Sequence, residues 1–121
     1  MLSGFKTILC AMNASGAYGR ALRFQRKGQD SEALEAAKYG LTLLDKPYVL
    51  RERPWVSSVL ALLTIFVEHY AHRLGVPGAS SQDLADSLRA FKKMAKSPDQ
   101  SGKNYQDEIL YLESRVQQLN G

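Results

Sequence analysis

The sequence predicts an all-α fold with about five helices. Apolar residues recur at intervals of three and four positions along most of the 121 residues, which is the spacing of one face of an α-helix. No stretch alternates apolar and polar residues over the length of a β-strand. Hydrophobic residues make up 45% of the chain and charged residues 23%, an ordinary globular composition. We therefore expect a single helical domain over residues 1–121.

The first helix is predicted over residues 3–27, and a break near Gly16 is left open as an alternative. Its apolar stripe consists of large side chains, namely Leu2, Phe5, Leu9 and Met12. Gly28 follows, and glycine adopts the left-handed conformation of a helix C-terminus without steric cost. The pattern predicts a long helix that stops at Gly28.

The second helix is predicted over residues 31–46. Asp30 precedes it and is placed to accept hydrogen bonds from its first free amides. One face carries mainly small residues, and a leucine stripe lies beside it: Ala33, Ala37, Gly40 and Leu44, then Leu34 and Leu41. Small residues at this spacing allow another helix to approach closely. Pro47 ends the segment.

The third helix is predicted to begin at Pro54, because proline suits the first turn of a helix. Apolar residues then surround it on most sides, which places it at the centre of the core. The apolar run over residues 55–67 is bounded by Arg53 and Glu68 and is shorter than the roughly 20 residues that a bilayer requires. The apolar stretch near the N-terminus is too short for a secretory signal. We expect a cytoplasmic protein without a membrane span.

Two further helices are predicted over residues 81–96 and 105–119. Ser80 to Asp83 resembles a capping box that opens the fourth, and Asn104 with Asp107 is placed to cap the fifth. Their buried stripes are Leu84, Leu88, Phe91 and Ala95, then Ile109, Leu112, Val116 and Leu119. The fifth helix packs on the preceding helices in the interpretation that we favour. Its heptad-like stripe leaves open a homodimer through this helix.

The segment from Tyr18 to Pro47 resembles one tetratricopeptide repeat, a helix–turn–helix unit of about 34 residues. The matching positions are Ala21 and Phe24 in the first helix, Gly28 at its end, Glu32-Ala33, Ala37 and Gly40 in the second helix, and then Pro47. Residues 54–98 keep only the outline of a second repeat. The resemblance implies a hairpin over 15–47, a degenerate hairpin over 54–98 stacked upon it, and a capping helix over 104–120.

The resemblance also implies a function. Such repeats are non-enzymatic adaptors that bind a peptide or a helix of a partner protein along a concave face lined by each first helix. The candidate partner-binding residues on that face are Tyr18, Leu22, Gln25 and Arg26. The subclass that grips a C-terminal carboxylate has lysine and asparagine where this chain has Tyr18 and Leu22, so we do not extend that activity to this chain.

The net charge of +4 arises in the first half of the chain, where residues 1–53 carry nine Lys or Arg and five Asp or Glu. Two basic clusters stand out: Arg20, Arg23, Arg26 and Lys27, and Arg89, Lys92, Lys93 and Lys96. Cations at a helix C-terminus complement its dipole, and this is the interpretation that we favour. The alternative is a small basic regulator that binds nucleic acid through these helix ends. In the second cluster the only interleaved aromatic residue is Phe91, which belongs to the buried stripe, so the aromatic residues that stack on single strands are missing there.

No residue pattern predicts catalysis, a cofactor or a metal site. His69 and His72 share one helix face, but no third ligand is near them in the sequence. Cys10 lies on an apolar helix without a base beside it, and as the single cysteine it excludes an internal disulfide. We therefore expect a protein that is not an enzyme.

Overall fold

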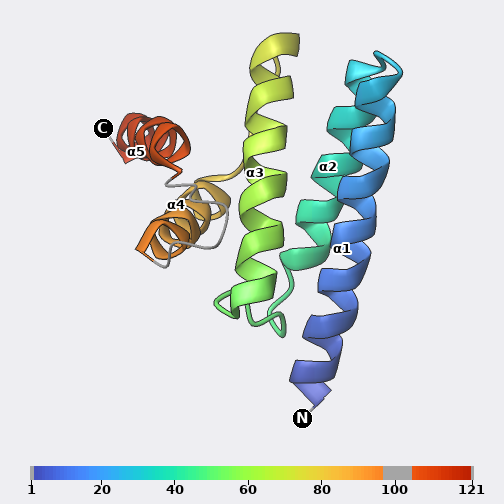
Figure 1. Ribbon diagram of the computed structural model, residues 1–121, viewed down its shortest axis with the longest axis vertical. Helices are drawn as coiled ribbons and strands as arrows, with labels where there is room; N and C mark the ends of the chain where they lie inside the picture. The colour runs from blue at the N-terminus through green and yellow to red at the C-terminus, as the bar shows by residue number, and fades with distance from the viewer. Residues whose placement is uncertain (1, 97–104, 121) are drawn as a thin grey trace.

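The described part of the chain is built from helices alone. The computed structural model describes residues 2–96 and 105–120, and these form α1 (Leu2–Arg26), α2 (Asp30–Leu44), α3 (Pro54–Leu74), α4 (Ser81–Lys96) and α5 (Gln106–Asn120). The predicted all-α class with about five helices is confirmed (Figure 1). The break considered near Gly16 is absent, because α1 is continuous from Leu2 to Arg26.

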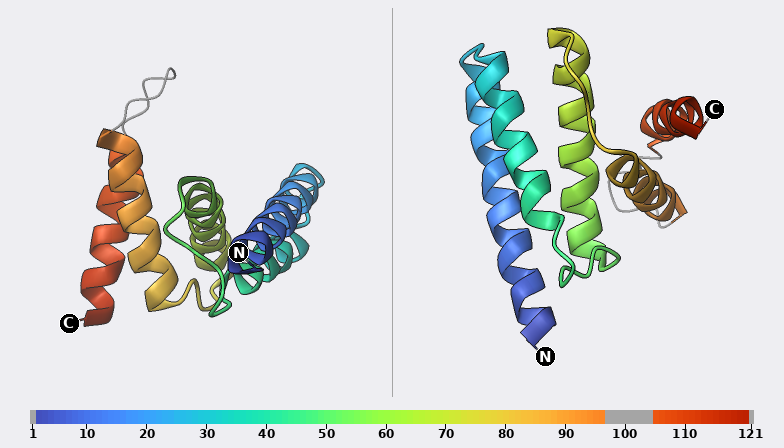
Figure 2. Two further views of the ribbon diagram at one scale, coloured as in Figure 1. Left: turned by 90° about the horizontal axis from the view of Figure 1, so that it is seen from below. Right: turned by 180° about the vertical axis from the view of Figure 1, so that it is seen from behind.

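The helices form two groups that meet on α3. The helices α1 and α2 run antiparallel, and α3 lies beside them with its axis in a similar direction (Figure 1). The pair α4 and α5 lies on the other side of α3 and crosses it steeply (Figure 2). The expected antiparallel hairpin over residues 54–98 is therefore wrong within the described residues, since α4 pairs lengthwise with α5 and not with α3.

The α1–α2 pair is held by small residues. Six alanines of the two helices are fully buried, together with Leu44: Ala11, Ala14, Ala17, Ala21, Ala33 and Ala37. Gly40 of α2 is packed so closely that a Cβ built on it would lie 2.9 Å from Leu63 Cδ1 and 3.2 Å from Ala17 Cβ. The small-residue face predicted for the second helix is thus where α1 and α3 approach α2.

Two glycines end helices in the left-handed conformation. Gly28 has a φ of 73°, and the Gln29 and Gly28 amides donate to the carbonyls of Phe24 and Gln25 at 2.9 and 3.0 Å. This is the Schellman arrangement, which satisfies carbonyls left over at a helix end. Gly75, with a φ of 69°, ends α3 in the same way.

The cap predicted at Asp30 is wrong. Asp30 is the first residue of α2, Gln29 holds the N-cap position, and no side chain caps the first amides there. The Asp30 carboxylate instead lies 3.1 Å from Arg73 Nε, near the end of α3. The ion pair thus joins the start of α2 to the end of α3. It engages the carboxylate that was expected to accept hydrogen bonds from the first amides of α2.

The central position predicted for α3 agrees with its burial. Its fully covered side chains include Leu60, Leu63, Val67 and Thr64. By length and composition, α3 is the one helix among the described residues that is long and apolar enough to cross a membrane, and 61% of its apolar window is buried inside the protein. That burial is contributed by the helices on both sides of it.

The start of α4 follows its predicted capping signal. Ser80 precedes the helix and its Oγ accepts a hydrogen bond from the Asp83 amide at 3.1 Å. Leu84 and Phe91 of the predicted stripe are buried, while Leu88 and Ala95 are half-buried. The expected partner of this stripe is found in α5, where Ile109 and Leu112 join the same apolar cluster. Leu119 is half-exposed, and the cap predicted at Asn104 lies outside the described residues.

A buried carboxylate fixes α5 to α3. Glu68 is 3% exposed, and its Oε1 accepts hydrogen bonds from Tyr111 Oη at 2.9 Å and from Arg115 Nε at 2.6 Å. Its Oε2 accepts one from the Ala79 amide at 2.8 Å. A Cβ at Gly78 would collide with this carboxylate, so glycine allows the α3–α4 loop to pass close to it. Glu68 therefore ties both α5 and the loop to the central helix.

Tyr111 makes part of this attachment sensitive to alkaline pH. Burial raises the pKa of Tyr111 above its ordinary value of 10.0, and the hydrogen bond to Glu68 acts in the same direction. The folded state thus holds the phenol proton more tightly than the unfolded state does. The resulting stabilisation is fully present below pH 10 and is lost as the pH rises through the pKa of the folded state.

We expect the free energy of unfolding to fall between about pH 9 and about pH 11, and to fall less in Tyr111→Phe. Urea titrations followed by circular dichroism at both pH values measure this. Tyr18, whose pKa is also raised by burial, is present in both proteins and so cancels in the comparison. An equal loss in the two proteins would contradict the assignment to Tyr111.

The large apolar stripe predicted for the first helix does not face the core. Phe5, Leu9 and Met12 are exposed, whereas Thr7, Ala11 and Ala14 on the opposite side of α1 are fully buried. The reason is the tightness of the α1–α2 contact, where alanine fits and a larger side chain does not. An apolar surface is left on the outer side of α1.

Candidate functional site

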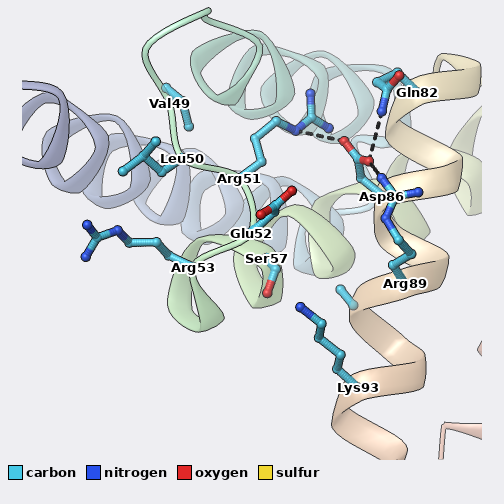
Figure 3. Close-up of a pocket in the computed structure, with 11 residues that line it drawn as sticks. Val49, Leu50, Arg51, Glu52, Arg53, Ser57, Gln82, Asp86, Arg89 and Lys93 are labelled. Atoms are coloured by element: carbon cyan, nitrogen blue, oxygen red, sulfur yellow. Dashed lines mark hydrogen bonds and ion pairs between the residues drawn. The ribbon is translucent and has the colours of Figure 1, made fainter.

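One cavity of the described structure lies between the α2–α3 loop and α4. It has a volume of about 890 Å³, within the range of ligand pockets in proteins. The loop contributes residues 49–53, and α4 contributes Gln82, Asp86, Arg89, Ala90 and Lys93 (Figure 3). We refer to this cavity as the loop–α4 pocket.

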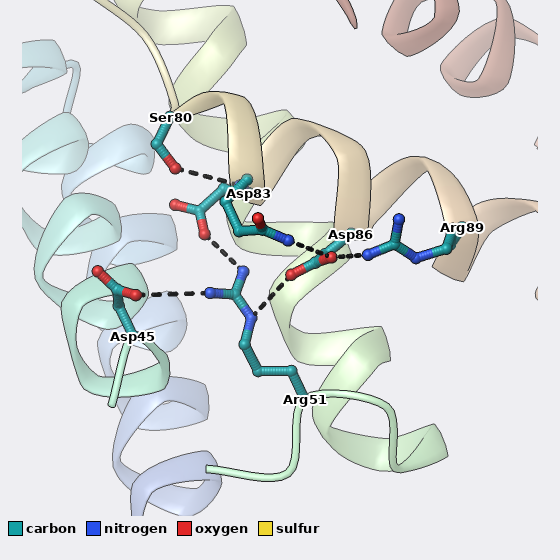
Figure 4. A network of polar contacts seen from close by, with 7 residues as sticks. Asp45, Arg51, Ser80, Asp83, Asp86 and Arg89 are labelled. Atoms are coloured by element: carbon teal, nitrogen blue, oxygen red, sulfur yellow. Dashed lines mark hydrogen bonds and ion pairs between the residues drawn. The ribbon is translucent and has the colours of Figure 1, made fainter. Parts of the chain in front are cut away.

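Arg51 forms one wall of the loop–α4 pocket and holds the loop against α4. Its guanidinium lies 2.5 Å from Asp83 Oδ1, 3.2 Å from Asp86 Oδ2 and 3.7 Å from Asp45 Oδ1 (Figure 4). The Arg51, Asp83 and Asp86 side chains are 15%, 11% and 13% exposed, so these two contacts are shielded from solvent more than surface ion pairs are, whereas Asp45 is 78% exposed. The network joins the loop to the first turns of α4.

Asp86 is shared among several donors on the same wall. Besides Arg51, it contacts Arg89, one helical turn further on in α4, and it accepts a hydrogen bond from Gln82 Nε2 at 2.9 Å (Figure 4). The carboxylates of Asp83 and Asp86 are thus engaged by cations of the protein itself. They leave little negative charge to repel an anionic ligand.

Two cations at the mouth of the pocket make no ion pair within the described residues: Arg53 on the loop and Lys93 on α4 (Figure 3). Both are exposed and both line the cavity, with Glu52 as the acidic residue beside them. Positive groups on two sides of one cavity attract an anionic ligand and orient it. The loop–α4 pocket is therefore a candidate site for a carboxylate-rich ligand.

Local sequence patterns indicate this pocket only weakly. Lys93 and Arg89 belong to a basic cluster near the C-terminus of α4. The dipole of α4 explains such a cluster without any ligand site. Asp83 and Asp86 are three positions apart, a spacing that places both on one face of a helix. Their partner Arg51 lies 32 positions before Asp83, which no local pattern can reveal.

The four residues predicted to bind a partner are split by the structure. Tyr18 stacks edge-on against Phe66 with ring centroids 5.9 Å apart, and Gln25 Nε2 donates to Tyr70 Oη at 2.8 Å. Leu22 is half-buried against the same core, whereas Arg26 is exposed. Three of the four side chains thus contact α3 or the core around it, although Gln25, like Arg26, is exposed.

His69 and His72 line a smaller cavity of about 320 Å³ between α3 and α5, with Asp107 and Glu108 on its other side. Among residues 2–96 and 105–120, no three His, Cys, Asp or Glu side chains are grouped so that they could hold a metal ion. Cys10 is half-buried, and its Sγ lies 3.9 Å from Tyr48 Oη. Neither place brings together a nucleophile, a base and an orienting group within the described residues.

Comparison with known proteins gives no further assignment: no family model, no curated protein and no solved structure matches this chain. The resemblance to a tetratricopeptide repeat stays a prediction from the sequence.

Proposed function

We propose that the chain is a non-enzymatic adaptor that binds an acidic segment of a partner protein in the loop–α4 pocket. The observation that carries this proposal is the position of Arg53 and Lys93, which make no ion pair within residues 2–96 and 105–120, on two sides of an 890 Å³ cavity. Its walls are held by the Arg51 network before any ligand arrives, which reduces the entropy lost on binding.

The adaptor hypothesis drawn from the tetratricopeptide resemblance is kept, but its site is moved. Tyr18 and Leu22 are half-buried against the protein's own core, and the exposed Gln25 is hydrogen-bonded to Tyr70. The loop–α4 pocket has a volume of about 890 Å³ and two cations without an ion pair among the described residues. A carboxylate-rich peptide satisfies the two cations, and its backbone can hydrogen-bond to Ser57 and Gln82.

Charge reversal at the mouth of the pocket tests this function. We expect Lys93→Glu to weaken binding of a fluorescein-labelled peptide rich in Asp and Glu by about tenfold, equal to about 1.4 kcal/mol. Fluorescence anisotropy measures the affinity. Arg53→Gln should weaken it in the same direction by a smaller factor, because it removes a charge without reversing it.

Lys38→Glu on α2 is the matched control, since it changes the net charge equally at a site outside the pocket. Equal losses in Lys38→Glu and Lys93→Glu would show that only the overall charge matters, and the pocket would be rejected as the site. A labelled single-stranded oligonucleotide is titrated in parallel. If it binds more tightly than the peptide at the same salt concentration, the nucleic-acid hypothesis replaces the adaptor.

A further inference from the structure

The outer side of α1 carries an apolar face that no described residue covers. Phe5 is 62% exposed, Ile8 49%, Leu9 44% and Met12 55%. Spacings of three, one and three positions place these four side chains on one face of the helix. A contiguous group of large apolar side chains on a surface marks a place where another apolar surface binds.

This outer face is separate from the side of α1 that packs in the core. The opposite side of α1 has its own buried residues, namely Thr7, Ala11, Ala14, Ala17 and Ala21, all fully covered. The N-terminal half of α1 is thus apolar on both sides, while its packing partners lie on one side only. The outer face contributes nothing to the α1–α2 contact, so its residues are available for binding.

The charge of α1 specifies what this face can bind. Residues 1–29 contain Lys6, Arg20, Arg23, Arg26 and Lys27 but neither Asp nor Glu. Phe5 and Arg23 are separated by 18 positions, or five helical turns, so both point to the same side of α1. Gly16 and Gly19 lie between them, and a Cβ at either would meet nothing within 4 Å, which leaves the middle of the face low and open.

The outer face of α1 is apolar at its N-terminal end and basic further along the helix. Such a face fits the boundary between the acyl chains and the headgroups of an anionic membrane. A second copy of the chain fits less well, because pairing α1 with α1 brings two acid-free basic helices together.

We propose that the outer face of α1 binds the surface of an anionic lipid membrane. Phe5, Ile8, Leu9 and Met12 enter the boundary of the acyl chains, and Arg23 with its neighbouring arginines contacts the lipid phosphates. The helix lies along the surface and does not span the bilayer. The inference is independent of the proposed peptide site, because the loop–α4 pocket is lined by other residues.

Vesicle flotation of the full chain tests this proposal. The vesicles contain phosphatidylcholine and phosphatidylserine in one series and phosphatidylcholine alone in the other. We expect the chain to float with the anionic vesicles and to partition at least about tenfold less onto the neutral ones. Met12→Glu should reduce partitioning onto anionic vesicles by about tenfold or more, and Arg23→Glu should reduce it in the same direction.

Leu110→Glu is the matched control, because Leu110 on α5 has the same 55% exposure as Met12. It should leave flotation unchanged, and circular dichroism should show the same helical content in all variants. The proposal is overturned if the chain does not float with anionic vesicles, or if Met12→Glu and Leu110→Glu float alike. It is also overturned if light scattering shows a dimer that Met12→Glu dissociates, since a second copy would then cover this face.

Discussion

Replacing Glu68 by alanine is expected to lower the free energy of unfolding by about 3 kcal/mol. The substitution removes the acceptor of Tyr111 Oη, Arg115 Nε and the Ala79 amide at once. It also leaves a void next to α3, because Glu68 is 3% exposed. Since Arg115 is 27% exposed, its charge can turn toward water, which keeps the loss at the lower end of that known for broken buried pairs.

Two measurements check the expected loss at Glu68. Urea unfolding gives the change in the free energy of unfolding. Hydrogen exchange should show that Glu68→Ala raises the amide exchange rates more in α5 than in α1 and α2, because Glu68 joins α5 to α3. Glu113→Ala is the matched control: Glu113 pairs with Lys92 at 3.4 Å on the surface, where both side chains are about half-exposed. Its loss should stay below about 1 kcal/mol. Equal losses at the two positions would contradict the role given to Glu68.

The Glu68 contacts also show why the direction of α4 was not predictable. Local spacing identified a helix over residues 81–96 and its cap at Ser80, both of which the structure confirms. The angle between α3 and α4 depends on the loop between them, which the Glu68 carboxylate holds at Ala79. The sequence marks Glu68 only as a charge that ends an apolar run, and nothing local to it indicates burial.

The ion pairs of the candidate site could not be predicted from local sequence either. Asp83 and Asp86 at the start of a helix are accounted for by its dipole, so the sequence gives no reason to seek a partner. The structure adds Arg51, which packs between these two carboxylates and Asp45. Contacts of this kind join residues that are distant in the sequence, and they determine where a pocket forms.

The α1–α2 pair was more accessible to prediction, because its determinants are local. Small residues at helical spacing in residues 31–46 marked the contact face, and Ala33, Ala37 and Gly40 are all buried there. The large residues of α1 were misleading, since in a close contact the alanines face the partner and Phe5 and Met12 face outward. Periodicity gives the faces of a helix, whereas the distance between helices decides which face is buried.

The closeness of that contact leads to a second large effect, at Gly40. We expect Gly40→Val to lower the free energy of unfolding by about 3 kcal/mol, because additional carbon atoms in a filled core force neighbouring groups apart. A Cβ alone would lie 2.9 and 3.0 Å from the two Leu63 methyl groups and 3.2 Å from Ala17 Cβ. Leu63 and Ala17 are fully buried, so they can give way only by displacing other core groups.

Gly16→Val on α1 separates packing from helix propensity. It makes the same chemical change inside a helix, but a Cβ at Gly16 meets nothing within 4 Å. Because valine has a higher helix propensity than glycine, Gly16→Val should change stability by no more than about 0.5 kcal/mol, in the stabilising direction. Urea unfolding of both variants gives the difference. If Gly40→Val were as stable as Gly16→Val, α2 could not lie as close to α1 and α3 as its buried small residues require.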